Sequence, residues 1–186
     1  MKIIIIGSST GGPYIIESIL SEFPVLPLTI IIVQHLPPTF TKTFKNHITS
    51  FTKMEVIIAD KETRIKEQQI IIAPAGHHLI VKNNRYFQLD DGEKLHGVRP
   101  AVDLTMMSMQ KLNNDKIMGI ILTGMGRDGA EGLIHLHQCG GITIVQDPAT
   151  APIKSMPQAS IKTGIVDFVL TPEQIREKII AFGNDN

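Results

Sequence analysis

The sequence has one cysteine, no net charge and no long apolar run, and each absence excludes a class of protein. Cys139 cannot form an internal disulfide and has no partner at the spacing of a zinc site, which fits a reducing compartment. Eighteen basic residues balance eighteen acidic ones, so no large field attracts nucleic acid or anionic lipid. No window approaches the ~20 apolar residues of a membrane-spanning helix. We therefore expect a cytoplasmic protein that binds no nucleic acid and does not insert into a membrane.

The composition is that of an ordinary folded domain. The 15 glycines and 11 prolines among 186 residues are too few for a low-complexity chain, and 42% of the residues are hydrophobic. A chain of this length can bury roughly 70% of the surface that it exposes when unfolded. No internal repeat, charge block or Pro/Ser-rich linker divides the sequence. These features predict one domain over residues 1–186.

Short runs rich in β-branched residues recur along the chain and predict strands. They cover residues 2–6, 28–33, 55–59, 69–73, 118–122, 142–145 and, more weakly, 168–170. Runs that are apolar at every position indicate strands covered on both faces. We therefore expect an α/β fold with a doubly wound, mostly parallel sheet flanked by helices.

The segments between these runs predict helices and one hairpin. Helices are expected at residues 13–23, 39–51, 103–112, 129–138 and 172–182, the last with Thr171 as its N-cap. Two short apolar runs within residues 79–95 flank Asn83-Asn84, a residue type that tolerates positive φ. This pattern predicts an added antiparallel hairpin.

Residues that directly follow strands are candidates for a functional site, because ligands bind at the carboxyl ends of strands in open parallel sheets. After the first run, residues 7–11 match G-x-S-x-G, the pattern of a nucleophile on a sharp strand-to-helix turn. This pattern makes Ser9 a candidate nucleophile and the Thr10 amide a candidate oxyanion donor. The alternatives are an ordinary Gly/Ser turn and a phosphate-binding loop without the Walker lysine.

Two further strand ends supply the other parts of acyl transfer. His35 follows the second run, where a neutral imidazole beside Ser9 can take the serine proton, although it could also be a surface histidine before a Pro-Pro turn. Asp128 follows the fifth run and can fix the histidine tautomer, although taken alone it is better explained as a helix N-cap. Together the three ends favour a catalytic triad of Ser9, His35 and Asp128.

Two rival functions come from other classes. Gly124, Gly126 and Gly129 match G-x-G-x-x-G in a strand-to-helix context, with Asp147 about 20 residues on, which is typical of a nucleotide-dependent enzyme. The second rival is a binding module without catalytic activity, which keeps the fold as an interaction surface. The histidines have no convincing metal-ligand spacing, so we expect no metal and no organic cofactor.

Six segments, taken in order, resemble one family: the catalytic domain of the protein-glutamate methylesterase of bacterial chemotaxis. The resemblance extends from residue 3 to about residue 170. The segments are residues 6–12 (IGSSTGG), 34–37 with 40–41 (QHLP and FT), 72–79 (IAPAGHHL), 98–103 (VRPAVD), 122–132 (LTGMGRDGAEG), and 141–147 with 156–157. Any one of these segments would be weak evidence for the family, but six of them in the family's order are a highly specific match.

The resemblance implies roles for particular residues and a reaction. The family's nucleophile, base and orienting acid fall on Ser9, His35 and Asp128, and the Met125 amide joins that of Thr10 in the oxyanion hole. The implied substrate is the γ-methyl ester of glutamate side chains on methyl-accepting receptor helices. In many members, glutamine deamidation at the same helices is implied as well.

Four features depart from the family pattern, and two of them, Ser8 in place of a common alanine and Ala101 in place of a frequent serine, have no consequence that we can derive. The typical member has an N-terminal phosphoryl-receiver domain, whereas this sequence begins at the first catalytic strand, so we expect no regulation by an attached receiver and leave a separate regulator open. Arg127 stands beside Asp128, where small or polar residues are usual. It could pair with Asp128 or lie on the rim of the site, and the rim is preferred.

Overall fold

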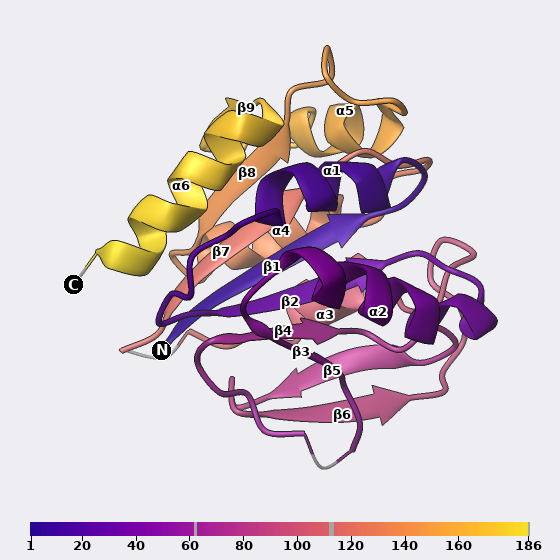
Figure 1. Cartoon of the computed structure of the whole chain (residues 1–186). Helices are drawn as coiled ribbons and strands as arrows, with labels where there is room; N and C mark the ends of the chain where they lie inside the picture. The colour runs from indigo at the N-terminus through magenta and orange to yellow at the C-terminus, as the bar shows by residue number, and fades with distance from the viewer. Residues whose placement is uncertain (62, 112–113, 186) are drawn as a thin grey trace.

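The computed structural model describes residues 1–61, 63–111 and 114–185 and has an α/β architecture (Figure 1). The strands are β1 (Lys2–Ser8), β2 (Thr29–Gln34), β3 (Glu55–Ile58), β4 (Gln69–Ile72), β5 (His78–Lys82), β6 (Tyr86–Asp90), β7 (Lys116–Ile121), β8 (Ile142–Gln146) and β9 (Phe168–Leu170). Seven of them form a parallel sheet in the order β3-β4-β2-β1-β7-β8-β9, and β5 pairs with β6 in an antiparallel hairpin. The predicted fold class is therefore confirmed.

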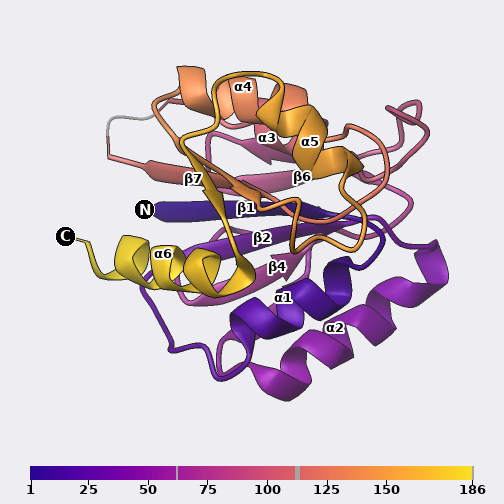
Figure 2. The same ribbon diagram turned by 90° about the horizontal axis from the view of Figure 1, so that it is seen from above.

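Helices cover both faces of the main sheet, as Figure 2 shows. One face carries α1 (Gly12–Leu20), α2 (Thr41–Phe51) and α6 (Pro172–Asn184), and the other carries α3 (Val102–Met107), α4 (Ala130–Gln138), α5 (Ser155–Ile161) and the β5–β6 hairpin. Successive side chains of a strand point to opposite faces, so Ile4 and Ile6 enter the first core while Ile3 and Ile5 enter the second. Burial on both sides explains why β1 is apolar at nearly every position.

The hairpin and the last helix form by the local signals that predicted them. Asn83 and Asn84 both adopt φ of 51°, the left-handed conformation that closes the β5–β6 turn. Thr171 caps α6 through a capping box, because its hydroxyl accepts from the Gln174 amide and the Gln174 side chain accepts from the Thr171 amide. Both predictions are confirmed.

Two helices differ from the sequence-based expectation. The helix expected at residues 103–112 ends at Met107, and its last expected residue, Leu112, lies outside the described residues. The Asn84 side chain bonds both backbone groups of Gln110, which holds the chain there in a non-helical path. Helix α5 was not expected from the sequence; it contains Pro157, which is tolerated in the first turn of a helix.

The chain starts in the middle of the sheet and places strands first on one side of β1 and then on the other. The helices that follow β1 and β7 therefore lie on opposite faces of the sheet, although the two strands are neighbours. Such a point opens a crevice at the carboxyl ends of the strands, where ligands bind in this class of fold. The residues after β1, β2 and β7 meet there.

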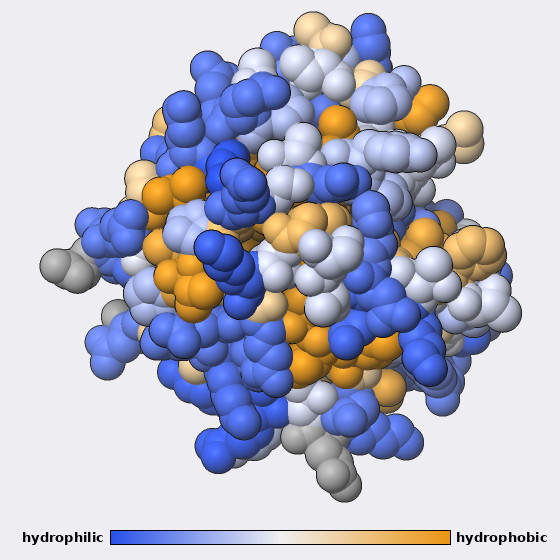
Figure 3. Space-filling model, viewed as in Figure 1, coloured by the Kyte–Doolittle hydropathy of each residue, from blue (hydrophilic) through white to orange (hydrophobic). Residues whose placement is uncertain are grey.

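The surface view in Figure 3 shows separate hydrophobic patches among hydrophilic side chains on the face that it presents. Within the described part of the chain, no helix is both long and apolar enough to cross a bilayer.

A close contact at Gly7 fixes α3 against β1 and generates a prediction. A Cβ on residue 7 would lie 2.4 Å from Cγ1 of Val102, at the start of α3. We therefore expect Gly7→Ala to push α3 away from the sheet and lower the free energy of unfolding by about 1–3 kcal/mol, measured by chemical denaturation. The matched control is Gly92→Ala, whose site is exposed and where we expect a change within about 0.5 kcal/mol. Equal stabilities of the two variants would contradict this account of α3.

Candidate active site

Ser9 lies on the turn between β1 and α1 and is held there by backbone bonds. Its amide donates to the Thr123 carbonyl (3.0 Å) and its carbonyl accepts from the Gly12 amide (2.9 Å). The buried Gln34 side chain adds a third tie, because Nε2 donates to the Ser9 carbonyl (2.8 Å) while Oε1 accepts from Ser8 Oγ (2.6 Å). The side chain of Ser9 is left half-buried at the carboxyl edge of the sheet.

The turn after β7 packs directly against Ser9. A Cβ on Gly124 would lie 2.7 Å from Ser9 Cβ and 2.2 Å from Met156 Sδ, so only glycine allows this approach. On either side of Met125, the Gly124 amide donates to the Ile153 carbonyl and the Gly126 amide to Ser155 Oγ. Close packing thus accounts for the first glycine of the G-x-G-x-x-G pattern without a nucleotide.

Two amides near Ser9 remain free. Among the described residues, neither the Thr10 amide nor the Met125 amide donates a hydrogen bond to the protein, although the Ser9, Gly12, Gly124 and Gly126 amides all do. Thr10 and Met125 are both exposed. Free amides on two turns that meet at a candidate nucleophile are the donors that an oxyanion hole requires.

His35 follows β2 directly, and its backbone amide donates to the Ser8 carbonyl (3.0 Å), so it lies next to the Ser9 turn. Its ring Nε2 lies 2.8 Å from Asp128 Oδ2. An ionised Asp128 accepts the hydrogen of Nε2, which leaves Nδ1 as the nitrogen with a free lone pair. The hydrogen bonds of the described residues do not include one between Ser9 Oγ and His35; such contacts are often long before substrate binds.

Asp128 is almost fully buried and accepts three hydrogen bonds. Besides His35, the Val102 amide donates to Oδ2 (2.7 Å) and the Asp103 amide donates to Oδ1 (2.9 Å). Burial by itself would raise the pKa of Asp128, but the hydrogen bonds from His35, Asp103 and Val102 outweigh it and lower the pKa below its ordinary value. The carboxylate is therefore ionised at neutral pH.

These contacts correct the interpretation of Asp128 as a cap of the helix that follows it. The N-cap of α4 is Gly129 in the left-handed conformation, with no side-chain cap. Asp128 instead binds first-turn amides of α3, which is more than twenty residues away in sequence. Without Asp128, neither amide would have a hydrogen-bond partner among the described residues, as is usual for the first amides of a helix.

Asp103 supports this arrangement, and the sequence did not reveal its role. Its Oδ1 accepts from the amides of Gly129 (2.9 Å) and Gly132 (2.8 Å), so it caps the helix that follows Asp128 while its own amide holds Asp128. Burial and the nearby Asp128 charge raise the pKa of Asp103, against hydrogen bonds from Gly132, His96 and Gly129. The only signal in the sequence was its position in the VRPAVD segment.

The two carboxylates also form a candidate metal cluster with His96. Ligand atoms of His96, Asp103 and Asp128 lie within 4.8 Å of one another. Each carboxylate already accepts hydrogen bonds from a histidine and from two backbone amides, and His96 Nε2 is bonded to Asp103 Oδ2 at 2.9 Å. Hydrogen bonding accounts for the cluster without an ion, so the absence of a metal stays a prediction.

Arg127 lies on the rim of the site. It is exposed, and its Nε faces His96 Nδ1 at 3.5 Å rather than the Asp128 carboxylate. Asp128 is held by other groups, so Arg127 leaves the bond between Asp128 and His35 undisturbed.

The fold and the site thus define a doubly wound α/β protein with serine, histidine and aspartate gathered at the carboxyl edge of the sheet. Comparison with known proteins names the family. The CheB methylesterase family model matches residues 4–179, and the chain belongs to that family.

Relatives of known structure and name agree with this assignment. The crystal structure of the Thermotoga maritima CheB methylesterase catalytic domain superimposes on this chain with a TM-score of 0.91 and 38% sequence identity. The match covers 96% of this chain and 97% of the Thermotoga chain. Proteins named protein-glutamate methylesterase/protein-glutamine glutaminase from Pyrococcus horikoshii and Haloarcula marismortui are 38% and 39% identical over 94% and 95% of this chain. The chain spans 49% of the length of each of these two relatives.

The contacts of Asp128 predict the effect of Asp128→Asn. The amide nitrogen of asparagine must face either His35, where it favours the wrong tautomer, or a backbone amide of α3, where two donors meet. We expect turnover to fall by about 10⁴-fold, as for the same change in serine proteases, and stability to fall by about 1–3 kcal/mol. Rate and unfolding free energy, measured on the same preparation, check both parts.

A pH titration and a matched variant make this prediction specific. Because the pKa of Asp128 is lowered by folding, its stabilisation is complete above the unfolded pKa of about 3.9 and is lost as pH falls through the folded value. The stability gap between wild type and Asp128→Asn should therefore shrink below about pH 4. Among the described residues, the Asp147 carboxylate accepts only from the Ala149 amide, so Asp147→Asn should keep nearly normal turnover. A full rate in Asp128→Asn would contradict the role of Asp128.

Proposed function

We propose that this chain is a carboxylic-ester hydrolase that removes methyl groups from glutamate γ-methyl esters on a protein, with Ser9, His35 and Asp128 as its catalytic triad. The observation that carries the proposal is the buried Asp128 carboxylate bonded to His35 beside the Ser9 turn. The family assignment supports the reaction, because the relatives are named for glutamate methylesterase and glutaminase activity. Neither a metal nor an organic cofactor takes part in the proposed route.

The first half of the reaction forms an acyl-enzyme. Ser9 Oγ attacks the ester carbonyl while His35 Nδ1 takes its proton, and Asp128 stabilises the imidazolium through Nε2. The free amides of Thr10 and Met125 stabilise the negative oxygen of the tetrahedral intermediate. The methoxy group then leaves with the proton from His35 as methanol, and the glutamyl carbonyl stays bonded to Ser9.

The second half releases the product. Water gives a proton to His35 and attacks the acyl carbonyl, a second tetrahedral intermediate forms, and Ser9 leaves with that proton. The product is a glutamate carboxylate. The same steps on a glutamine side chain release ammonia, so deamidation needs no further residue.

The substrate, the cellular location and the extent of the domain complete the proposal. We infer that the protein substrate is the methylated helix of a chemotaxis receptor, as the family resemblance implies. The single cysteine favours a cytoplasmic location, and residues 1–186 act as one catalytic domain.

Ser9→Ala separates an enzyme from an idle binding module. It should abolish methanol release from a polypeptide that carries glutamate γ-methyl ester, because the acyl-enzyme needs the Ser9 oxygen. Stability should change by less than about 0.5 kcal/mol, since no hydrogen bond of the Ser9 hydroxyl is among those of the described residues. Methanol release and thermal unfolding measure the two quantities.

The matched control is Ser18→Ala. Ser18 is exposed on α1, and within the described ranges its hydroxyl donates only to the Ile15 carbonyl, so this variant should keep wild-type turnover. Near wild-type methanol release by Ser9→Ala would rule out Ser9 as the nucleophile. Absence of release by wild type on every esterified polypeptide would favour the binding module.

A further inference from the structure

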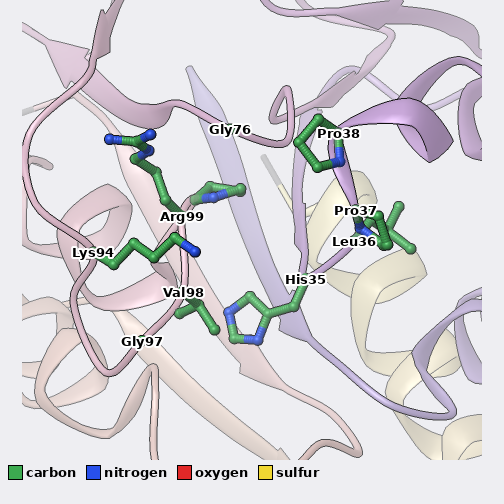
Figure 4. A pocket seen from close by; sticks show the side chains of 10 residues that line it. His35, Leu36, Pro37, Pro38, Gly76, Lys94, Gly97, Val98 and Arg99 are labelled. Atoms are coloured by element: carbon green, nitrogen blue, oxygen red, sulfur yellow. The ribbon is translucent and has the colours of Figure 1, made fainter.

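A cavity of about 470 Å³ lies beside His35 (Figure 4). Its wall is partly apolar, formed by Leu36, Pro37, Val98 and Pro100. Neither Ser9 nor the free amides of Thr10 and Met125 line it. The cavity is therefore next to the place where the ester reacts but is not that place, and it is of a size that holds small ligands or single side chains.

Of the described residues that line this cavity, two are cationic, Lys94 and Arg99, and none is acidic. In Figure 4 the Lys94 side chain extends toward the middle of the cavity, on the side of His35, and the Arg99 guanidinium lies farther from His35. Among the described residues, Lys94 has no hydrogen bond and no ion pair. Arg99 Nε is a buried donor that has no acceptor in the part of the chain that the structure describes. The cavity thus offers the positive charge of Lys94, which no group of the described residues pairs with.

The loop that carries Lys94 is held in place from several directions. Arg99 Nη1 donates to the carbonyls of Asp91 and Gly92, each at 2.7 Å, and His78 Nε2 lies 2.9 Å from the Glu93 carbonyl. The Asp91 side chain pairs with His77, and no ion pair between Asp91 and Lys94 is among those of the described residues. A lysine without a partner on a loop fixed this firmly is positioned to bind something outside the protein.

We propose that the cavity is a subsite for the substrate polypeptide, and that it takes the carboxylate of a residue that flanks the reacting glutamate, with Lys94 as the recognising cation. This inference rests on the proposed function, because a polypeptide that places one side chain at Ser9 brings its neighbours against adjacent surfaces. The apolar wall strengthens the attraction by excluding water from part of the ion pair. The geometry makes Lys94 a specificity residue, since no described contact joins it to the triad.

The test uses pairs of peptides that carry one glutamate γ-methyl ester and differ only in a flanking residue, glutamate or glutamine, at each position within four residues. Wild type should prefer the acidic peptide at one or more positions by about threefold to tenfold in kcat/KM, mostly through KM. Lys94→Met keeps most of the aliphatic side chain and removes the charge, so the ratio of kcat/KM for the acidic peptide to kcat/KM for the glutamine peptide should fall to about one. Lys94→Glu should reverse it, and added salt should weaken the wild-type preference.

Lys53→Met is the matched control. Lys53 is exposed and does not line the cavity. It precedes β3 and therefore lies at the amino ends of the parallel strands, whereas His35 lies at their carboxyl ends. This variant should keep the wild-type ratio. A wild-type ratio near one at every position, an unchanged ratio in Lys94→Met, or an equal fall in Lys53→Met would overturn the proposal.

A binding measurement separates failure of this inference from failure of the proposed function. Fluorescently labelled forms of the same peptides are titrated with the Ser9→Ala chain and with Ser9→Ala/Lys94→Met, so that no turnover is needed. A preference for the acidic peptide that disappears with Lys94 supports the subsite even if wild type releases no methanol. Equal binding of both peptides by both chains overturns the subsite, whatever the activity.

Discussion

The hydrogen bond between the buried Asp128 carboxylate and His35 is the interaction on which the rest of the site depends. The carboxylate is buried, yet the amides of Val102 and Asp103 and the ring of His35 supply the hydrogen bonds that keep it ionised. A buried carboxylate without such donors would be protonated and could not select a histidine tautomer. With them, one group joins the first turn of α3, the end of β2 and the turn after β7.

Packing of α3 makes this carboxylate site possible. Gly7 lets Val102 approach β1 closely, and Asp103 reaches across to the amides at the start of α4. The two aspartates therefore hold each other's helices: Asp128 caps α3, and Asp103 caps α4. Such a reciprocal arrangement fixes two helix ends at once and satisfies backbone groups that burial would leave unpaired.

The sequence predicted the parts of this protein that depend on local pattern. Strands buried on both faces, the Asn83-Asn84 turn and the residues at the strand ends all follow from spacing and residue type. The backbone amides that bind Asp128 and Asp103 could not be predicted in that way, because they lie 25 to 29 residues away in sequence and their position depends on how α3 packs. The cavity at Lys94 was missed for the same reason, since its walls come from distant segments.

In the proposed mechanism, Asp128 holds His35 with its hydrogen on Nε2, which leaves Nδ1 free to take the Ser9 proton. The most direct measurement is the ¹⁵N chemical shift of the two ring nitrogens of His35 at a pH where the ring is neutral. The account predicts a protonated Nε2 and an unprotonated Nδ1 in wild type, and loss of this preference in Asp128→Asn. A wild-type ring that carries its hydrogen on Nδ1 would contradict the account.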